Sequence, residues 1–335
     1  MELTTVWFLL IGVLWAGYFL LEGFDFGVGI LLPVVGKDDT SRRLAINTIG
    51  PVWDANEVWV LVAGGATFAA FPEWYATLFS GFFLPLLIIL VALIVRGLAF
   101  EYRGKRPGAA WKRGWDRAIF WGSLIPAILW GVAFGNILRG VPIDANHEYV
   151  GGFFNLLNPY ALLGGLTTLS LFTLHGAVFL ALKTDGPMRE QAGRLAARLA
   201  LVAVPVAAAF LIWTGLTHED GWGIALSVLA ALALIGAVLA TRARREGWAF
   251  TATGATILLA VAALFVTLFP NVMPSTLDAA NSLTVTNASS TPYTLKVMTW
   301  VAVCFTPIVL IYQGWTYWVF RKRLTLSDIP ASGAH

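Results

Sequence analysis

Residues 76–100 of the 335-residue chain read ATLFSGFFLPLLIILVALIVRGLAF and contain a single charged residue, Arg96. An α-helix needs about 20 predominantly apolar residues to cross the hydrocarbon core of a bilayer. We therefore predict that this stretch is a transmembrane helix.

The rest of the chain has the same character. Hydrophobic residues make up 58% of it and charged residues only 12%, whereas soluble domains are about 25% charged. No Lys or Arg precedes the first apolar run, so we interpret it as a retained span and not as a signal peptide. The sequence predicts an all-α polytopic membrane protein that forms one integral membrane domain over residues 1–335. We expect about nine transmembrane helices, at residues 6–33, 51–71, 76–100, 118–138, 159–182, 198–215, 222–240, 248–269 and 296–319.

The basic residues predict the orientation of these spans. Of the 22 Lys and Arg residues, all but Arg139 and Lys296 fall on one side of the predicted membrane, if Arg96 and Arg198 at span edges are counted with their neighbouring loops. Cytoplasmic loops carry the excess of Lys and Arg. We expect the N-terminus outside and the C-terminus in the cytoplasm, and we interpret the net charge of +3 as a topology signal, not as a nucleic-acid surface.

Four carboxyl groups fall at membrane depth in the first two predicted spans. Glu22 and Asp25 are spaced i, i+3, as are Asp54 and Glu57, so each pair lies on one helical face. Charged groups at this depth are costly and mark functional sites. We hypothesise a cluster that takes protons from the cytoplasm. The alternative is that Asp54 and Glu57 only complement the N-terminus of a helix that begins near Pro51.

The histidines bear on haem binding. Of four histidines, only His175 falls inside a predicted span. A haem with two axial histidines needs two at matching depth, so we expect no haem or metal to be ligated by this chain. His175 is more typical of a buried hydrogen-bonding residue than of a ligand. Cys304 is the only cysteine, which excludes an intrachain disulfide.

Several segments together resemble a known family. They are GFDFGVG at 23–29, INTIGPVWDANEVW at 46–59, GGA at 64–66, GVAFGN at 131–136, FFNLLNP at 153–159, FP at 269–270 with MPS at 273–275, and LKVMTW at 295–300. Over nearly the whole chain and in the same order, they resemble subunit II of cytochrome bd-type quinol oxidases. The most specific of them is Trp-Asp-x-Asn-x-Val-Trp at 53–59.

The resemblance implies a function in a complex of the bacterial cytoplasmic (inner) membrane. Such oxidases oxidise quinol and reduce oxygen to water with cytoplasmic protons. Two haems b and one haem d are carried by subunit I, the partner of this chain, and a small third subunit often joins the pair. Quinol and lipid are the expected small-molecule partners, and a quinone bound to this chain is compatible with the resemblance.

The resemblance also implies roles for single residues, none of them directly catalytic. Asp54 would be the proton-pathway aspartate and Asp25 a second buried acid, while Trp59 and Trp53 would line an oxygen or proton tunnel.

Two features depart from the family pattern. Glu57 and His175 occupy positions that are amides in some relatives, which puts their roles in doubt; with Glu22, Glu57 remains a candidate for the proton pathway. The outer loop between the sixth and seventh predicted spans is also shorter than in some members, so a partner contact made there is in doubt.

Two other functions fit parts of the sequence. A proton-coupled secondary transporter would also use membrane carboxyls, but such folds often contain paired interrupted helices, and the sequence shows no such pairing. A self-sufficient b-type cytochrome is opposed by the number of histidines.

Overall fold

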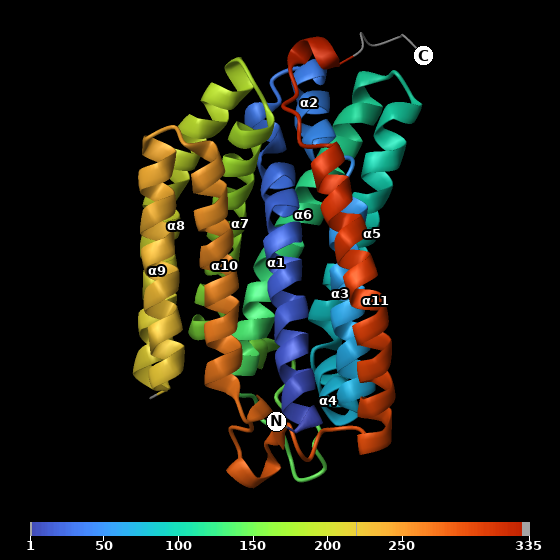
Figure 1. Cartoon of the computed structure of the whole chain (residues 1–335), viewed down its shortest axis with the longest axis vertical. Helices are drawn as coiled ribbons and strands as arrows, with labels where there is room; N and C mark the ends of the chain where they lie inside the picture. The colour runs from blue at the N-terminus through green and yellow to red at the C-terminus, as the bar shows by residue number, and fades with distance from the viewer. Residues whose placement is uncertain (1, 219, 330–335) are drawn as a thin grey trace.

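The computed structural model describes residues 2–218 and 220–329, and most of its helices run along the longest axis of the molecule (Figure 1). The long helices are α1 (Leu3–Val35), α3 (Trp53–Ala70), α5 (Phe83–Tyr102), α6 (Ala109–Arg139), α7 (Pro159–Lys183), α8 (Pro187–Thr217), α9 (Gly221–Arg242), α10 (Glu246–Leu268) and α11 (Pro292–Val319). The shorter elements are α2 (Asp39–Ile49), α4 (Pro72–Gly81), four 3-10 turns, η1 (Arg103–Lys105), η2 (Phe153–Leu156), η3 (Ala279–Asn281) and η4 (Leu326–Asp328), and two strands, β1 (Asn271–Met273) and β2 (Leu283–Thr284).

The predicted all-α polytopic membrane fold is confirmed. Within the described residues, eight helices are long and apolar enough to cross a membrane. The remaining predicted span corresponds to α3, which is less apolar because it carries Asp54 and Glu57. Its 18 residues reach about 27 Å at 1.5 Å per residue, close to the thickness of the hydrocarbon core, and it runs beside α1 and α11 (Figure 1).

The prediction of one helix over residues 76–100 is wrong in detail. The chain bends at Phe82, so that α4 ends at Gly81 and α5 starts at Phe83. Pro85 explains the break, because proline has no N–H to bond the carbonyl four residues earlier.

The short helix α2 was not predicted. It is polar for its length and starts at a reciprocal cap, in which the Ser41 N–H donates to Asp38 Oδ1 over 2.7 Å and the Asp38 N–H donates to Ser41 Oγ. The hydrogen bond from the Ser41 backbone lowers the pKa of Asp38 below its usual value. Asp39 in the first turn of α2 forms ion pairs with Arg103 over 2.9 Å and with Lys112 over 2.7 Å, in the basic region that follows α5.

Tight packing of α1 against α7 organises the centre of the bundle. A Cβ atom placed on Gly27 would lie 2.1 Å from the carbonyl oxygen of Phe172 and 2.7 Å from Cα of Gly176. Small residues of this kind let membrane helices approach closely. Gly27 therefore serves close packing of α1 on α7, and α1 is continuous from Leu3 to Val35.

The two long connections at the end opposite α2 fold against each other. Strands β1 and β2 pair in antiparallel fashion within the second connection. The Val141 N–H of the first connection donates to Pro274 O over 3.0 Å, and the Thr276 N–H of the second donates back to Val141 O over 3.0 Å. These bonds make the end of the bundle a folded cap.

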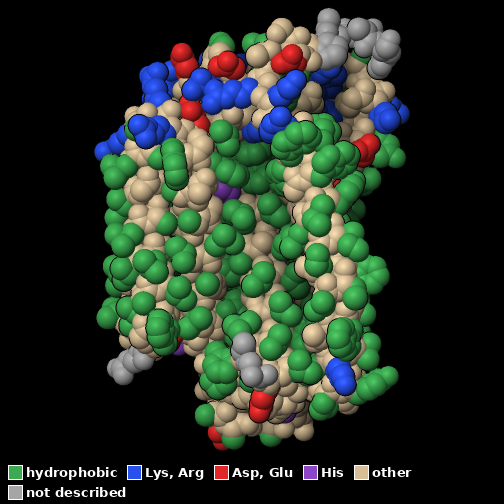
Figure 2. Space-filling view, viewed as in Figure 1, with side chains coloured by type: hydrophobic (Ala, Val, Ile, Leu, Met, Phe, Trp, Pro, Cys, Tyr) green, Lys and Arg blue, Asp and Glu red, His purple; other side chains and the backbone are tan. Residues whose placement is uncertain are grey.

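Basic side chains are gathered at the other end, around α2 and the neighbouring helix ends (Figure 2). On the face shown in Figure 2, the asymmetry derived from the sequence appears as a gathering of Lys and Arg at this end of the bundle, with acidic side chains among them. That this end faces the cytoplasm remains a prediction from the positive-inside rule.

Candidate functional site: a buried cluster of carboxyl, amide and guanidinium groups

The site is centred on an ion pair inside the bundle. Arg96 of α5 and Glu22 of α1 are both fully buried, and Arg96 Nη1 donates to Glu22 Oε1. The guanidinium carbon of Arg96 lies 4.8 Å from the ring centre of Phe26. A buried charge must be paired to be tolerated, so each partner explains why the other can remain at this depth.

Asp25 lies one helical turn from Glu22 and is held by an amide. Asn56 of α3 donates from Nδ2 to Asp25 Oδ2 over 2.7 Å, and both side chains are fully buried. The Asn56 Oδ1 atom accepts a hydrogen bond of 2.7 Å from the Tyr317 hydroxyl and a longer one of 3.3 Å from Gln313 Nε2. Asn56 therefore connects α1, α3 and α11.

Several polar atoms of this cluster have no hydrogen-bond partner among the described residues. They are Glu22 Oε2, Asp25 Oδ1, Glu57 Oε2, and Nε and Nη2 of Arg96. Most buried polar groups in proteins are paired with protein or with ordered water. A set of unpaired donors and acceptors on adjacent helices can therefore bind water and exchange protons with it.

The four predicted carboxyl groups are only partly brought together. Glu22 and Asp25 are buried side by side, and Glu57 is half-buried on α3, near enough to Arg96 to interact electrostatically with it. Asp54 is exposed, one turn before Glu57, on the outer face of α3.

Two members of the cluster were missed by the sequence reasoning. Arg96 was counted with the basic residues at the edge of a span, and this assignment is wrong, because its side chain points into the bundle and pairs with Glu22. Arg96 is the single charged residue in the apolar stretch 76–100, and this isolation could have indicated a buried ion pair. Asn56 lies inside the most specific motif, but an uncharged amide gives no sign of its partner.

The two predicted tunnel residues pack at the sides of the cluster. Trp59 donates from Nε1 to Gln313 Oε1 over 2.9 Å, which extends the hydrogen-bond network from Asn56. Trp53 contacts Phe100, with ring centres 4.9 Å apart. A tunnel lined by them remains a prediction.

His175 is placed as a packing residue. It is fully buried, its Nδ1 lies 2.7 Å from Thr253 Oγ1, and its ring stacks on Phe250 with centres 4.6 Å apart. Phe24 lies against the ring as well. Its Nε2 atom is buried and has no hydrogen-bond partner among the described residues. That this chain ligates no haem remains a prediction from the number of histidines. Over residues 2–218 and 220–329, no group of three or more His, Cys, Asp or Glu side chains is arranged to hold a metal ion.

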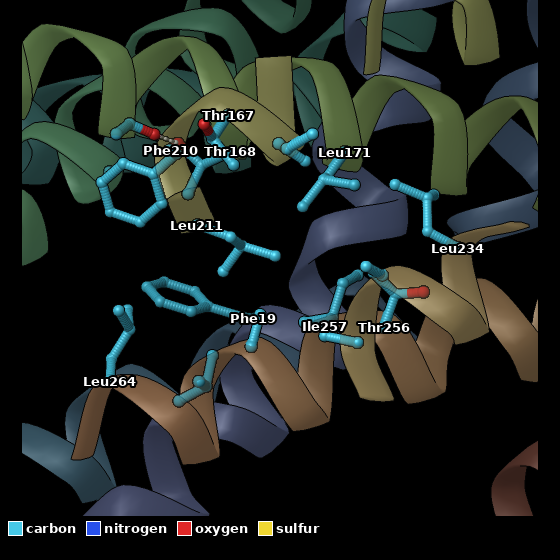
Figure 3. Close-up of a pocket in the computed structure, with 18 of the residues that line it drawn as sticks. Phe19, Thr167, Thr168, Leu171, Phe210, Leu211, Leu234, Thr256, Ile257 and Leu264 are labelled. Carbon is cyan, nitrogen blue, oxygen red and sulfur yellow. Dashed lines mark hydrogen bonds between the residues drawn. The ribbon is translucent and has the colours of Figure 1, made fainter. Parts of the chain in front are cut away.

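An apolar cavity of about 170 Å³ lies among α1, α6, α7, α8, α9 and α10. None of the residues of the carboxyl cluster lines it. Figure 3 shows Phe19, Leu211 and Leu264 pointing into it. Its hydroxyl groups are already engaged, since Thr167 and Thr256 donate to carbonyl oxygens of their own helices and Thr168 donates to Ala127 O over 2.6 Å. The cavity can therefore take an apolar chain, but it offers few free donors to a polar head.

The fold and the buried ionisable cluster define a polytopic helical membrane protein with charged groups held inside its bundle. A family model for cytochrome bd terminal oxidase subunit II matches residues 3–320. The chain belongs to this family, and it is a multi-pass protein of the cytoplasmic membrane.

Individual relatives agree with the family match. The chain is 44% identical over 329 residues to cytochrome bd ubiquinol oxidase subunit 2 of Bacillus subtilis, covering 97% of both chains. It is 37% identical over 362 residues to cytochrome bd-I ubiquinol oxidase subunit 2 of Escherichia coli K12, covering 97% of this chain and 96% of the relative. A chain in the solved structure of bd oxidase from Geobacillus thermodenitrificans has the same fold, with a TM-score of 0.77 at 19% identity over 96% of this chain and all of that one.

Proposed function

We propose that this chain is the subunit of a quinol oxidase that supports a haem-bearing subunit I and conducts protons toward the site of oxygen reduction. The complex would oxidise quinol and reduce oxygen to water with protons from the cytoplasm. Haems b and d, bound to subunit I, would supply the electron transfer and oxygen chemistry. The observation that carries the proposal is the buried cluster around Asp25, Asn56, Glu22 and Arg96.

The chain has one face suited to cover by subunit I. On α3, Val58, Leu61 and Val62 are exposed. In α11, among 28 residues, only Leu295 and Gln313 are buried. A helix that packs so little within its own chain, next to an exposed apolar face of α3, supports docking of the partner on α3 and α11.

Docking there would explain the position of Asp54. A carboxylate at membrane depth is costly when it faces lipid, but Asp54 would lie in the interface if subunit I covers α3. A route would then run from Asp54 past Glu57, one turn along α3, toward the buried pair of Asp25 and Glu22, with Glu57 assisting the transfer without being required for it. In this role the residues accept and release protons at carboxylate oxygens, and Arg96 balances their charge.

The apolar cavity suits the chain of a quinone or a lipid. Its lining of Phe19, Leu211 and Leu264 (Figure 3) gives contact area to hydrocarbon, and its hydroxyls already have acceptors. We propose an isoprenoid or acyl chain in this space, with its polar head elsewhere.

Purification of the tagged chain from its native membrane tests the proposal. The expected result is a complex with a second, haem-bearing subunit and quinol-dependent oxygen consumption, while this chain expressed alone contains no haem by pyridine haemochrome assay. Haem on the isolated chain, at about one per chain, would indicate a self-sufficient cytochrome. A haem-free preparation without a partner, which moves protons together with a solute in vesicles, would indicate a transporter.

A further inference from the structure

A polar cavity at the basic end of the molecule is separate from the buried carboxyl cluster. It has a volume of about 410 Å³ and is formed where α7 ends, α8 starts, α9 ends and α10 starts. This size lies within the range of about 300–1,000 Å³ that small-molecule sites occupy. Val178, Ala181, Ala196 and Ala249 give it an apolar floor, and its rim is charged.

The charges of the rim do not cancel. Three acidic residues line the cavity, and each forms an ion pair with an arginine. Arg189 pairs with Asp185 (Nη1 to Oδ1, 3.6 Å) and with Glu246 (Nη2 to Oε1, 2.8 Å). Arg194 pairs with Glu190 (Nη1 to Oε2, 3.5 Å). Arg323 adds a second cation, 3.7 Å from Glu246. The acids are thus already neutralised within the chain.

Two further arginines of the rim, Arg242 and Arg244, are exposed. Across the described part of the chain, no acidic side chain lies within 4.0 Å of either guanidinium. Helices α8 and α10 also begin beside the cavity without a side-chain cap, and helix N-termini attract anions. The rim of this open cavity therefore carries an excess of positive charge.

The cavity lies at the level where lipid headgroups are expected. Trp248, in the first turn of α10, is 68% exposed, and exposed tryptophans are enriched at the boundary between hydrocarbon and water. Lys and Arg side chains gather at this end of the bundle (Figure 2). Basic pockets between membrane helices on this side bind anionic headgroups.

We propose that this cavity binds the phosphate of an anionic phospholipid, with Arg242 and Arg244 as the phosphate-binding residues. The small apolar residues of the floor would contact the glycerol backbone and the first carbons of the acyl chains. Because Arg242 and Arg244 have no acidic partner among the described residues, a headgroup of net negative charge would neutralise them. We therefore expect an anionic lipid such as phosphatidylglycerol to bind in preference to a zwitterionic one.

Native mass spectrometry of the intact complex, titrated in neutral detergent with phosphatidylglycerol or phosphatidylcholine, tests the proposal. The wild type should retain phosphatidylglycerol in preference to phosphatidylcholine. The double variant R242Q/R244Q should bind phosphatidylglycerol about tenfold more weakly or worse, since each basic residue near an anionic headgroup contributes of the order of a fivefold change. The double variant R242K/R244K should retain most of the binding, because lysine keeps the charge.

The matched control is R113Q/R117Q. These two arginines are exposed on α6, outside the cavity, and their removal changes the net charge by the same amount. Unchanged lipid binding in the control supports the site. An equal loss of binding in R242Q/R244Q and R113Q/R117Q would show that only the net charge of the protein matters, and it would overturn the proposal. Equal retention of both lipids by the wild type, or displacement of the lipid by millimolar inorganic phosphate, would also overturn a lipid site. Haem content and elution volume show whether each variant is folded.

Discussion

Asn56 of α3 donates a hydrogen bond of 2.7 Å to Asp25 of α1, and its own carbonyl oxygen accepts one of 2.7 Å from Tyr317 of α11. A single amide thus joins a buried acid to α11, which is the least buried of the eight candidate spans in the described residues. If subunit I docks on α11, the environment of Asp25 depends on the partner through Asn56. The two roles proposed for this chain, support of subunit I and proton transfer, are linked by this hydrogen-bonded connection.

Replacing Asn56 by Ala should destabilise the complex. Asp25 would lose its donor and Tyr317 its acceptor, and a buried polar group left unpaired costs about 1–3 kcal/mol. We expect a lower midpoint of thermal unfolding and a lower yield of assembled complex. Asn146→Ala, in the exposed outer connection, is the control and should leave the midpoint unchanged. An Asn56→Ala complex as stable as the control would show that the amide is not structurally important.

Arg96 and Glu22 should behave as a coupled pair. Arg96→Leu leaves Glu22 buried without its cation, and breaking a buried ion pair in this way costs about 3–5 kcal/mol. The double variant Arg96→Leu with Glu22→Leu removes both charges and should recover a large part of this loss. Thermal unfolding of both single variants and the double variant measures the coupling. Additive losses would contradict a direct pairing.

Close contact between α1 and α7 should make Gly27 intolerant of a side chain. The Cβ of Gly27→Ala would lie 2.1 Å from the Phe172 carbonyl oxygen, so the helices must separate, and we expect loss of assembled protein. Gly236→Ala in α9 meets no atom within 4 Å and should be neutral or gain up to about 1 kcal/mol, since Ala favours helix over Gly. Expression and unfolding midpoints of the two variants compare them directly. Equal behaviour would refute the packing argument.

The orientation can be tested with single cysteines on a Cys304→Ser background. Ala110→Cys and Glu190→Cys should react with a membrane-impermeant maleimide only from the cytoplasmic side. Ala145→Cys and Ala280→Cys should react only from outside, because the two pairs lie at opposite ends of the bundle and the basic end is expected inside. Labelling of both pairs from the same side would contradict the topology.

The sequence predicts the helical membrane fold well because length and hydropathy alone identify a span. Hydropathy does not predict the exact ends of helices or the short polar helices between spans. The break at Phe82 depends on Pro85 inside an otherwise uniform apolar stretch, and α2 is too polar and too short to be seen by hydropathy.

The candidate site could be predicted only in part. The spacing of Glu22 and Asp25 identifies one face of a helix, but it does not show which residues of other helices face it. Arg96 and Asn56 complete the cluster through contacts across 74 and 31 residues of sequence, and no local pattern records such contacts. Asp54 shares a helix with Glu57 yet lies on the exposed face, because the direction in which α3 packs is set by α1 and α11.

The central claim is that carboxyl groups of this chain conduct protons to the oxidase, and Asp54 is its most accessible member. Asp54→Asn keeps the size of the side chain and removes the titratable group. Glu73→Gln is the matched control, because Glu73 is also an exposed acid in the first turn of a helix. If Asp54 only complemented the N-terminus of α3, both amides should be tolerated equally.

The decisive measurement is steady-state oxygen consumption per haem d of the purified Asp54→Asn complex with quinol as donor. We predict wild-type haem content and a turnover reduced by about tenfold or more, equivalent to about 1.4 kcal/mol of barrier for each factor of ten. Glu57→Gln should have a smaller effect and Glu73→Gln none. An Asp54→Asn complex with full haem content and undiminished turnover would contradict the proton route and leave Asp54 as a helix-start acid.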